Sequence, residues 1–374
     1  MVELTQDLTI ARVGLEGQGI GYDDARNIFF VPGALPGDRV RVTFSEGAPR
    51  YRDARLVEVI ESSPDRVDPE CAAFPECGGC DWLNWRYDAQ VAAKQAMLDH
   101  VLGRAGWVPE KRMDFRVAPE IYGYRNRIQV RHEGNRVGFY RRKSHDLVDV
   151  GVCRVAHPAL NAVLGVMRDE PVAERHKTEL SVDEQGTVHR VEDSPHASRG
   201  FEQINPAQNE VLRTMVADRV RAVGAKRVLE LFCGNANLTT AYLDSVEECI
   251  GVDSGEAVVA AARLKRDAMG ETATRKLALV CEPADRTLRR KLPPEFRAAY
   301  DTLILDPPRS GLSTGLESFI HPDLRNIIYV SCSPASFVRD VQCLKGAFAL
   351  NDVEGIDMFP HTRHVEFVAR FSRC

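Results

Sequence analysis

The stretch IIYVSCSPASF places a single thiol, Cys332, directly after four apolar or aromatic residues. Ser331, Ser333 and Pro334 then interrupt the apolar run. This pattern predicts a buried strand that carries the thiol to the carboxyl end of a sheet, where open α/β sheets bind their ligands. An activated thiol at such a position is a candidate covalent nucleophile. The alternative is a buried thiol that packs as a small apolar side chain.

The C-terminal stretch MFPHTRHVEFVARF offers a partner for such a thiol. Covalent catalysis by a thiolate at an unsaturated ring needs a nearby base that removes a proton before the thiol leaves. Glu366 is the candidate base, and His361 and His364 lie near it in the sequence. The alternative for Glu366 is a solvated charge on an edge strand.

Three further cysteines, Cys71, Cys77 and Cys80, occur in CAAFPECGGC, beside two glycines that let the backbone wrap closely around a compact group. Three thiolates in a reducing compartment indicate a metal site, either zinc or an iron–sulfur cluster. A tetrahedral site needs a fourth ligand. Cys153 in VDVGVCRVAHP is one candidate, and His157, which suits zinc better, is the other. The spacing leaves both the metal and the fourth ligand open.

The segment RVLELFCGNANLT is typical of an apolar strand, a tight turn at Gly234 and the start of a helix, which together place a ligand beside a helix N-terminus. It resembles the first motif of S-adenosylmethionine-dependent methyltransferases. Asp253 ends the next strand and is placed to accept hydrogen bonds from a ribose diol. Asp306 in LILDPPRSGL is expected at a strand end that faces the same crevice. The alternative is a turn that serves only sheet packing.

The elements that must position these groups follow from the apolar patterning. Residues 1 to about 60 alternate in short strand-like runs with Gly and Pro at the turns, which predicts a small five-stranded barrel of the oligonucleotide-binding kind. The stretch GQGIGYDDARNIFFVPGALPGDRVRV resembles a TRAM domain, an RNA-binding β-barrel, and a barrel without a ligand is the alternative. From residue 201 onward strand and helix patterns alternate, which predicts a mainly parallel, doubly wound α/β sheet.

The chain has 374 residues, of which 44% are hydrophobic, and this is enough for two or three domains with separate cores. Its first residues lack the basic head and apolar core of a secretion signal. No apolar run approaches the roughly 18 residues needed to cross a membrane. We therefore expect a soluble, cytoplasmic monomer with reduced thiols and no membrane partner.

The net charge of −5 gives no general support for nucleic-acid binding, so that function must depend on local patches. Arg125, Arg127 and Arg131 recur along YRNRIQVRH at spacings that would place them on one face of a strand. The basic residues 141–143 follow two aromatic residues in FYRRKSH, which is typical of a surface that contacts phosphates and stacks on bases. The alternative is an ordinary solvated strand face.

The thiol and the methyl-donor motif together suit the methylation of a pyrimidine at C5. C5 of uracil is a poor nucleophile until a thiolate adds to C6, which turns the ring into an enolate that attacks a methyl sulfonium. A base must then take the C5 proton so that the thiolate can leave. Cys332 and Glu366 have the chemistry for these two roles.

The chain as a whole resembles the RNA uracil-5-methyltransferase family, in its branch with a TRAM domain and an iron–sulfur cluster. The resemblance runs nearly end to end, through CAAFPECGGCDW, YRNRIQV, VGFYRRKSHDLVDVGVC, FEQINPAQNEVL, LELFCGNANLT, LDPPRSGL, YVSCSP and HTRHVEFVARF. It implies Cys332 as the nucleophile and Glu366 as the base. It implies a [4Fe–4S] cluster on Cys71, Cys77, Cys80 and Cys153. It also implies contacts to S-adenosylmethionine from Gln203, Phe232, Asn237, Asp253, Asp285 and Asp306.

Two positions depart from the family's usual sequence. Ala236 stands where the first methyltransferase motif usually has a second glycine, and its methyl group narrows the approach of the backbone to the cofactor. Ser333 stands where the family usually has asparagine after the catalytic cysteine. Serine keeps a donor and an acceptor but is shorter, so rate or target choice is expected to differ if that side chain orients the base or the uracil.

We therefore expect a TRAM-like RNA-binding barrel in residues 1–62, a central β-rich domain with the iron–sulfur cluster in 63–200, and a Rossmann-like methyltransferase domain in 201–374. The expected product is 5-methyluridine in structured RNA, with 23S ribosomal RNA favoured and transfer RNA as the alternative. The cluster is expected to hold the central domain against RNA, because methyl transfer needs no electrons.

Three other interpretations account for less of the sequence. An RNA cytosine-5-methyltransferase typically has a second cysteine in its Asp-Pro motif, where this chain has Arg309. A radical S-adenosylmethionine enzyme would need C-x3-C-x2-C, whereas this chain has C-x5-C-x2-C. A non-catalytic iron–sulfur RNA-binding protein would not need both Cys332 and Glu366.

Overall fold

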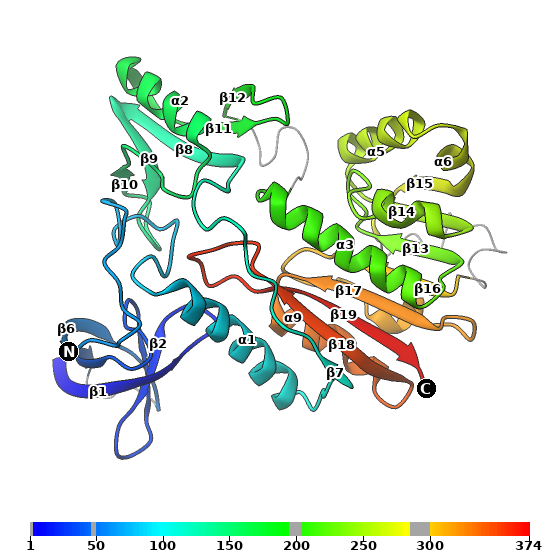
Figure 1. Ribbon diagram of the computed structural model, residues 1–374. Helices are drawn as coiled ribbons and strands as arrows, with labels where there is room; N and C mark the ends of the chain where they lie inside the picture. The colour runs from blue at the N-terminus through cyan, green and yellow to red at the C-terminus, as the bar shows by residue number, and fades with distance from the viewer. Residues whose placement is uncertain (1–2, 46–49, 194–202, 285–299) are drawn as a thin grey trace. The chain divides into compact units, whose positions relative to one another are not determined.

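The structure is a computed structural model that describes residues 3–45, 50–193, 203–284 and 300–374 (Figure 1). The chain divides into two compact units. The first takes the described parts of Met1–Met97, Glu120–Ser194 and Phe359–Arg363. The second takes the described parts of Leu98–Pro119, Pro195–Met358 and His364–Cys374. A short segment near the C-terminus therefore belongs with the N-terminal half of the chain.

The first unit begins with a curled sheet in the order β5-β3-β2-β1-β4-β6. Alternate residues of β4, Val40, Val42 and Phe44, are buried, as expected for a strand with one face on a core. Within the described residues the sheet has six strands and not the expected five, because the chain pairs with β3 before Ala54 and with β4 after it. The strands are β1 (Glu3–Val13), β2 (Gly19–Tyr22), β3 (Ile28–Val31), β4 (Arg39–Ser45), β5 (Tyr51–Asp53) and β6 (Arg55–Glu61).

The rest of the first unit is built on an antiparallel sheet in the order β10-β9-β8-β11-β12. Helix α2 (Pro158–Asp169) packs its apolar face, with Leu160, Leu164 and Met167, against buried residues of β8, β9 and β11. Helix α1 (Tyr87–Arg104) begins in this unit and ends in the second. The strands are β8 (Arg127–Gly134), β9 (Arg136–Tyr140), β10 (Leu147–Asp149), β11 (Val172–Val182) and β12 (Val188–Glu192).

The second unit contains a sheet in the order β15-β14-β13-β16-β17-β19-β18-β7. Strands β15 to β17 of this order pair in parallel, β19 pairs antiparallel with both β17 and β18, and the short β7 pairs with β18. The near-continuous apolar runs of β13, β16 and β17 reflect strands buried on both faces. The strands are β7 (Lys111–Arg112), β13 (Arg227–Leu231), β14 (Glu248–Asp253), β15 (Leu277–Cys281), β16 (Thr302–Leu305), β17 (Asn326–Ser331), β18 (Phe348–Ile356) and β19 (Glu366–Arg373).

Helices connect these parallel strands, which confirms the doubly wound α/β sheet expected of this half of the chain. Helix α3 precedes β13 and packs against β17 and β19 (Figure 1). Helix α9 follows β17, so it begins just beyond the candidate thiol. The helices are α3 (Pro206–Ala222), α4 (Thr239–Tyr242), α5 (Glu256–Ala268), α6 (Glu271–Lys276) and α9 (Pro334–Asp340), with short 3-10 turns η1 (Leu243–Ser245), η2 (Leu316–Phe319) and η3 (Val341–Leu344).

Candidate functional site

Three predicted site residues meet at one edge of the sheet in the second unit. Asp306 directly follows β16, and Cys332 directly follows its parallel neighbour β17. Strand β19 runs antiparallel to β17, so its first residue, Glu366, lies at the same edge, next to the pair Ser331 and Phe367. This is the edge at which open α/β sheets bind ligands. The topology therefore brings together the nucleophile and the base that the sequence predicts.

The charges of these groups act on one another. Burial, and then the carboxylates of Glu366 and Asp306, raise the pKa of the Cys332 thiol to about 12. Burial raises the pKa of Glu366, which is 4% exposed, to about 7. Burial and Glu366 likewise raise the pKa of Asp306 well above its usual range. A carboxyl group that titrates near neutral pH is suited to removing a proton during catalysis.

Arg309 is a site residue whose role the sequence reasoning missed. Its positive charge lowers the pKa of both Cys332 and Glu366, and its Nη2 lies 3.3 Å from Nε2 of His364. Its signal in the sequence is the last residue of the DPPR motif, which follows the strand that ends at Leu305. Arg309 thus supplies the positive charge that a thiolate and a carboxylate at one sheet edge need.

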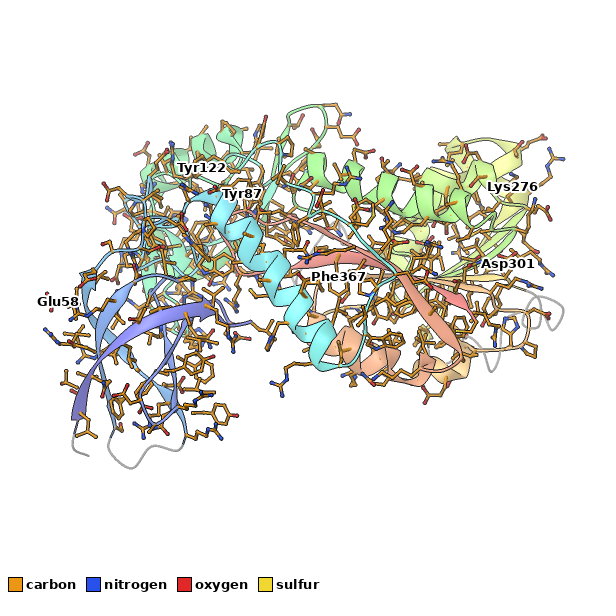
Figure 2. The ribbon with its side chains drawn as sticks, turned by 60° about the horizontal axis from the view of Figure 1, so that its bottom comes forward. Glu58, Tyr87, Tyr122, Lys276, Asp301 and Phe367 are labelled. Atoms are coloured by element: carbon orange, nitrogen blue, oxygen red, sulfur yellow. The ribbon has the colours of Figure 1, made fainter. Side chains whose placement is uncertain are left out.

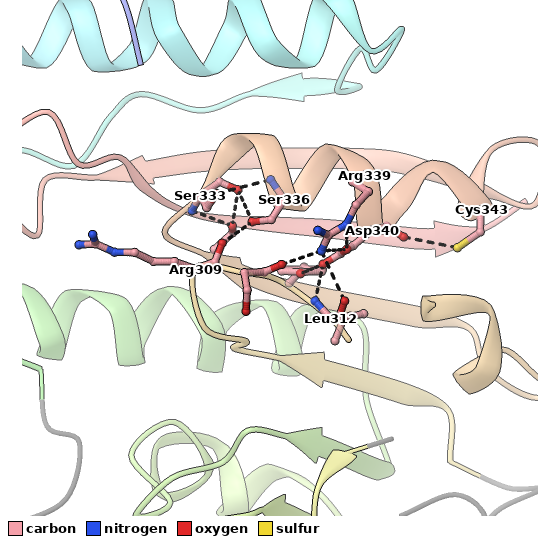
Figure 3. A network of polar contacts seen from close by, with 10 residues as sticks. Arg309, Leu312, Ser333, Ser336, Arg339, Asp340 and Cys343 are labelled. Carbon is pink, nitrogen blue, oxygen red and sulfur yellow. Dashed lines mark hydrogen bonds and ion pairs between the residues drawn. The ribbon is translucent and has the colours of Figure 1, made fainter. Parts of the chain in front are cut away.

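Helix α9 fixes the loop that carries Arg309 (Figure 3). The Ser336 hydroxyl donates to the Arg309 carbonyl at 3.0 Å, and Arg339 donates to the Ser310 carbonyl at 2.7 Å. The Asp340 carboxylate accepts from the Leu312 amide at 2.8 Å. These bonds join α9, which begins just beyond Cys332, to the DPPR loop.

Ser333, one of the two departures from the family's usual sequence, caps helix α9. Its side chain accepts from the Ser336 amide at 3.4 Å. Serine and asparagine are both preferred helix caps, so the serine preserves this function. The position therefore has a structural role at the N-terminus of α9.

The predicted cofactor turn follows β13, beside the end of β14. Asp253 accepts through Oδ2 from the Gly234 amide at 3.0 Å and through Oδ1 from the Gly255 amide at 2.9 Å. The turn contains three left-handed residues, Phe232, Gly234 and Ala236, with φ of 63°, 54° and 62°. Ala236 is fully buried and adopts a conformation that favours glycine, so this departure adds backbone strain at the turn.

The other predicted cofactor contacts have different surroundings. Asn237 exchanges two amide hydrogen bonds with Asn209 of α3, at 2.8 and 3.0 Å. Gln203 is half-buried and lies just before α3, and Asp285 lies outside the described residues. Asn209 is a partner that the sequence reasoning missed, and its only signal is its place in the FEQINPAQNEVL motif.

A buried carboxyl on β13 was also missed. Glu230 is 1% exposed, and its Oε2 accepts from Thr239 at 2.6 Å and from the Tyr242 hydroxyl at 2.5 Å. Burial raises its pKa to about 7, although both hydroxyls act to lower it. These bonds join β13, which precedes the cofactor turn, to α4, which follows it.

The four predicted metal-ligating cysteines come together in the first unit. Cys71, Cys77, Cys80 and Cys153 line one cavity of about 50 Å³. Burial raises the pKa of Cys77 and of Cys153, and it raises the pKa of Cys80 to about 12. Repulsion between neighbouring thiolates raises these pKa values further. Within the described ranges no three His, Cys, Asp or Glu side chains form a preassembled metal site. The residues nonetheless suit a metal that prefers thiolate ligands, because four thiols and no carboxylate or imidazole are among the described residues that line the cavity.

His157, the competing fourth ligand, has another role. Its Nδ1 accepts from the Ala159 amide at 3.2 Å, so it caps the N-terminus of α2. It is not among the described residues that line the thiol cavity. Cys153 is held there by Asn161, whose Oδ1 accepts from its amide at 2.8 Å and whose Nδ2 donates to its carbonyl at 3.1 Å.

One glycine of the thiol loop, residues 71–80, is required by a close approach. The Gly78 amide donates to the Tyr140 carbonyl at 2.9 Å. A Cβ at Gly78 would lie 2.9 Å from that same carbonyl oxygen, closer than real Cβ contacts. Gly78 therefore lets the thiol loop lie against the end of β9.

The basic residues of the central segment divide between different roles. Arg125 was expected on the strand face with Arg127 and Arg131, but β8 begins at Arg127 and Arg125 lines the thiol cavity. Its Nε is buried there and has no hydrogen-bond partner among the residues that the structure describes, and its charge lowers the pKa of Cys80. In the 141–143 run, Arg141 pairs with Glu76 and Arg142 pairs with Asp81 at 2.5 Å.

Among the residues that the structure describes, no helix has both the length and the apolarity needed to cross a bilayer.

Known sequences resemble the chain over nearly its whole length. The family described as tRNA (Uracil-5-)-methyltransferase matches residues 172–373, more than half of the chain, and the TRAM domain matches residues 1–57. The 23S rRNA (uracil(1939)-C(5))-methyltransferase of Xylella fastidiosa (strain 9a5c) is 31% identical, with 96% of this chain and 95% of that protein covered. The corresponding protein of Bordetella pertussis is 30% identical, with 97% and 92% covered.

A solved structure has the same fold. The tRNA (uracil-54, C5)-methyltransferase of Pyrococcus abyssi, in complex with S-adenosyl-L-homocysteine, superimposes with a TM-score of 0.70 at 21% identity. The superposition covers 98% of this chain and 100% of the Pyrococcus chain. The Rossmann-like fold expected from the sequence is thereby confirmed. Together with the family match over more than half of the chain, these comparisons confirm that the protein belongs to the RNA uracil-5-methyltransferase family and carries an N-terminal TRAM domain.

Proposed function

We propose that the protein methylates C5 of a specific uridine in structured RNA, with Cys332 as the covalent nucleophile and Glu366 as the base. The observation that carries this proposal is the meeting of Cys332, Asp306 and Glu366 at the carboxyl edge of β16 and β17. Only the sheet topology brings these residues together, since 34 positions separate Cys332 from Glu366 in the chain.

S-adenosylmethionine supplies the methyl group in this proposal and leaves as S-adenosylhomocysteine. The Cys332 thiolate forms a bond to C6 of uracil, and the ring electrons shift to C5, which becomes the nucleophile. After C5 has gained its methyl group, Glu366 takes the C5 proton. The electrons of that C–H bond restore the C5–C6 double bond and release the Cys332 thiolate.

The cofactor would be held by the turn after β13 and by the acids at the strand ends. The turn that contains Phe232 and Gly234 is fixed by the Asp253 carboxylate, and Asp306 completes the edge. Gln203, Asn237 and Asp285 remain proposed contacts on the strength of the family resemblance. Because Asn237 bonds with Asn209, we propose that these two amides act together.

We propose that Cys71, Cys77, Cys80 and Cys153 hold a [4Fe–4S] cluster. The four thiols that share a cavity support this, as does the charge of Arg125 beside them. Thiolate ligands are the usual ligands of iron–sulfur clusters. Since methyl transfer moves no net electrons, the proposed role of the cluster is to order the thiol loop and the RNA-binding segment.

We propose a division of labour among a TRAM-like barrel in 1–62, a cluster segment in 63–200 and a methyltransferase part in 201–374. The compact units run across these limits, since the barrel and most of the cluster segment share a unit and residues 98–119 belong with the second. The division is therefore one of function. RNA binding is assigned to the first two parts and chemistry to the third.

For the target, we propose 23S ribosomal RNA, with transfer RNA as the alternative. Support comes from two relatives that are about 30% identical over nearly the whole chain and are named for 23S rRNA. Support for transfer RNA is the fold shared with the Pyrococcus enzyme. We expect 5-methyluridine to disappear from one position of ribosomal RNA when the gene is deleted. Base-resolution mapping of both RNA classes checks this, and loss only from transfer RNA would favour the alternative.

A methylation assay on bulk RNA with a labelled methyl donor tests the activity itself. The wild-type protein should label RNA, and Cys332→Ser should not, because a hydroxyl is a far weaker nucleophile than a thiolate near neutral pH. Labelling by the serine variant at the wild-type rate would exclude Cys332 as the nucleophile.

A further inference from the structure

The residues just beyond the thiol loop hold a distant segment of the chain in the first unit. This segment, Phe359–Arg363, is called the lead segment here because it leads into β19. The main-chain amides of Asp81 and Trp82 both donate to the His361 carbonyl, at 2.9 and 3.0 Å. Asp81 directly follows Cys80, so these bonds begin at the last cysteine of the loop.

The Asp81 side chain adds a second set of contacts to the lead segment. Its Oδ2 accepts from the Arg363 amide at 2.9 Å, and its Oδ1 accepts from the Arg363 guanidinium at 3.1 Å. Arg142 donates to the same carboxylate and to the Cys80 carbonyl, the latter at 3.0 Å. The carboxylate is 7% exposed, so water competes little for these bonds. Asp81 therefore connects three segments, which are the thiol loop, the residues that directly follow β9, and the lead segment.

Further residues of the first unit fix the rest of the lead segment. Lys94 donates to the Phe359 carbonyl and Tyr124 donates to the Pro360 carbonyl, each at 3.0 Å. Gln90 accepts from the His361 amide at 3.0 Å, which helps to hold His361 at a φ of 63°. The Tyr122 ring stacks on the His361 ring with centroids 4.8 Å apart, and the centroid of the Tyr87 ring lies 6.4 Å from that of His361. Figure 2 labels both tyrosines. Carbonyls of three successive residues in the segment thus have partners in this unit.

The lead segment ends three residues before the proposed base. Arg363 is followed by His364, Val365 and Glu366, the first residue of β19. A base acts only from a narrow range of positions, and a misplacement of about 1 Å can cost roughly a hundredfold in rate. Only His364 and Val365 separate the lead segment from Glu366, so the backbone links the base directly to this segment. A shift of the lead segment can therefore reach the base along the chain.

We propose that Asp81 is a positioning residue for Glu366 and that it couples the order of the thiol loop to proton removal from C5. The proposal rests on the proposed function, because it takes Glu366 as the base. It also gives the thiol loop a role in the reaction that needs no electron transfer.

The test compares Asp81→Asn with Asp88→Asn. Asp88 is an exposed aspartate in the first turn of α1 that pairs with Arg86, so its variant controls for loss of one carboxylate. With Asp81→Asn we expect kcat to fall about tenfold or more while KM for RNA changes less than about twofold. A covalent RNA–protein adduct should accumulate on denaturing gels, since addition and methyl transfer precede proton removal. Asp88→Asn should match the wild type in both measurements.

Hydrogen exchange provides a readout that is independent of activity. The Arg363 amide donates to Asp81, so its peptide should exchange faster in Asp81→Asn and at the wild-type rate in Asp88→Asn. Iron content should stay at the wild-type level in both variants. A lower iron content, with proportional loss of activity and no adduct, would contradict the proposal because the effect would then arise from cluster loss.

Wild-type turnover by Asp81→Asn without adduct overturns the inference, provided that Glu366→Gln does accumulate the adduct. If Glu366→Gln keeps turnover, the proposed function itself fails, and the two failures are therefore distinct. If Asp81→Asn does not fold, the variant Arg363→Gln tests the inference instead. It removes the guanidinium that donates to Asp81 but keeps Asp81 and the bond from the main-chain amide of residue 363. We expect it to show the same adduct at a lower level, and wild-type behaviour would overturn the inference.

Discussion

Arg309 places a positive charge beside a thiol and a carboxyl that both resist ionisation. Burial raises the pKa of Cys332 to about 12 and that of Glu366 to about 7, and Arg309 lowers both. The proposed reaction needs the thiolate to add and the carboxylate to take a proton. The guanidinium therefore favours the ionised form of each of the two proposed catalytic groups.

Removing this charge should move the pH dependence of turnover. Glu366 acts as a base only when ionised, so proton removal should increase as pH rises through about 7. In Arg309→Gln the pKa of Glu366 rises, and the midpoint of the profile should move to higher pH with a lower rate at neutral pH. The pH profile of kcat measures this. Arg309→Lys keeps the charge and should keep the midpoint, and an equal shift in both variants would show that charge is not the cause.

The sequence predicted some of these residues better than others, for physical reasons. Cys332 and Asp306 follow strongly apolar runs, so their placement at strand ends could be predicted from pattern alone. Arg309 was missed because its role depends on a loop that Ser336 and Arg339 fix, and loop geometry has no periodic signal. Arg125 was misplaced because strand boundaries are uncertain by a few residues, and Arg125 lies two positions before the first residue of β8.

At the scale of elements, a buried network of ion pairs joins α3 to the antiparallel strands β18 and β19. Arg219 of α3 pairs with Asp352 at 2.8 Å and with Glu354 at 2.9 Å, and Arg370 of β19 also pairs with Asp352, at 2.7 Å. Arg219 is 7% exposed. The network holds the helix across the strand that begins with Glu366.

Breaking this network should destabilise the fold. Arg219→Met leaves buried carboxylates with one partner fewer, which typically costs about 3–5 kcal/mol. Arg221→Met provides a control on the same helix, because Arg221 is about half exposed and its ion pairs are 3.6 Å long. The control should change the free energy of unfolding by less than about 1 kcal/mol. Chemical denaturation of both variants measures the difference, and equal effects would contradict a stabilising role for the buried pairs.

The four cysteines of the thiol cavity lie in loops, and the metal that they are proposed to hold is a separate prediction. Anaerobically purified protein should be brown and carry about four irons per chain. Cys153→Ala should lose most of this iron, since Cys153 lines the cavity, whereas His157→Ala should keep it, since His157 caps α2. Metal analysis and visible absorbance measure both. Stoichiometric zinc in the wild type, or loss of iron only in His157→Ala, would contradict the proposed cluster and its ligands.

At the scale of the whole molecule, sequence patterns predicted the order of folds along the chain. The alternation of strands and helices after residue 201 predicted the parallel sheet, and the short strands before residue 60 predicted a small barrel. The resemblance of that stretch to a TRAM domain is confirmed by the comparisons. The lead segment was not predicted, because its membership in the first unit depends on contacts with Asp81 and Tyr124, far away in sequence. Such non-local hydrogen bonds leave no periodic trace in a single sequence.

The covalent adduct tests the central claim most directly. In Glu366→Gln, Cys332 should still add to C6 of uracil, and C5 should still gain the methyl group. The C5 proton should then remain, because the glutamine amide is not a base near neutral pH. With RNA and a methyl-labelled donor, a denaturing gel should show a slow band that contains both RNA and label. The double variant Cys332→Ser/Glu366→Gln should show no such band. A band that persists in the double variant, or full turnover without a band in Glu366→Gln, would contradict the assignment of these two residues.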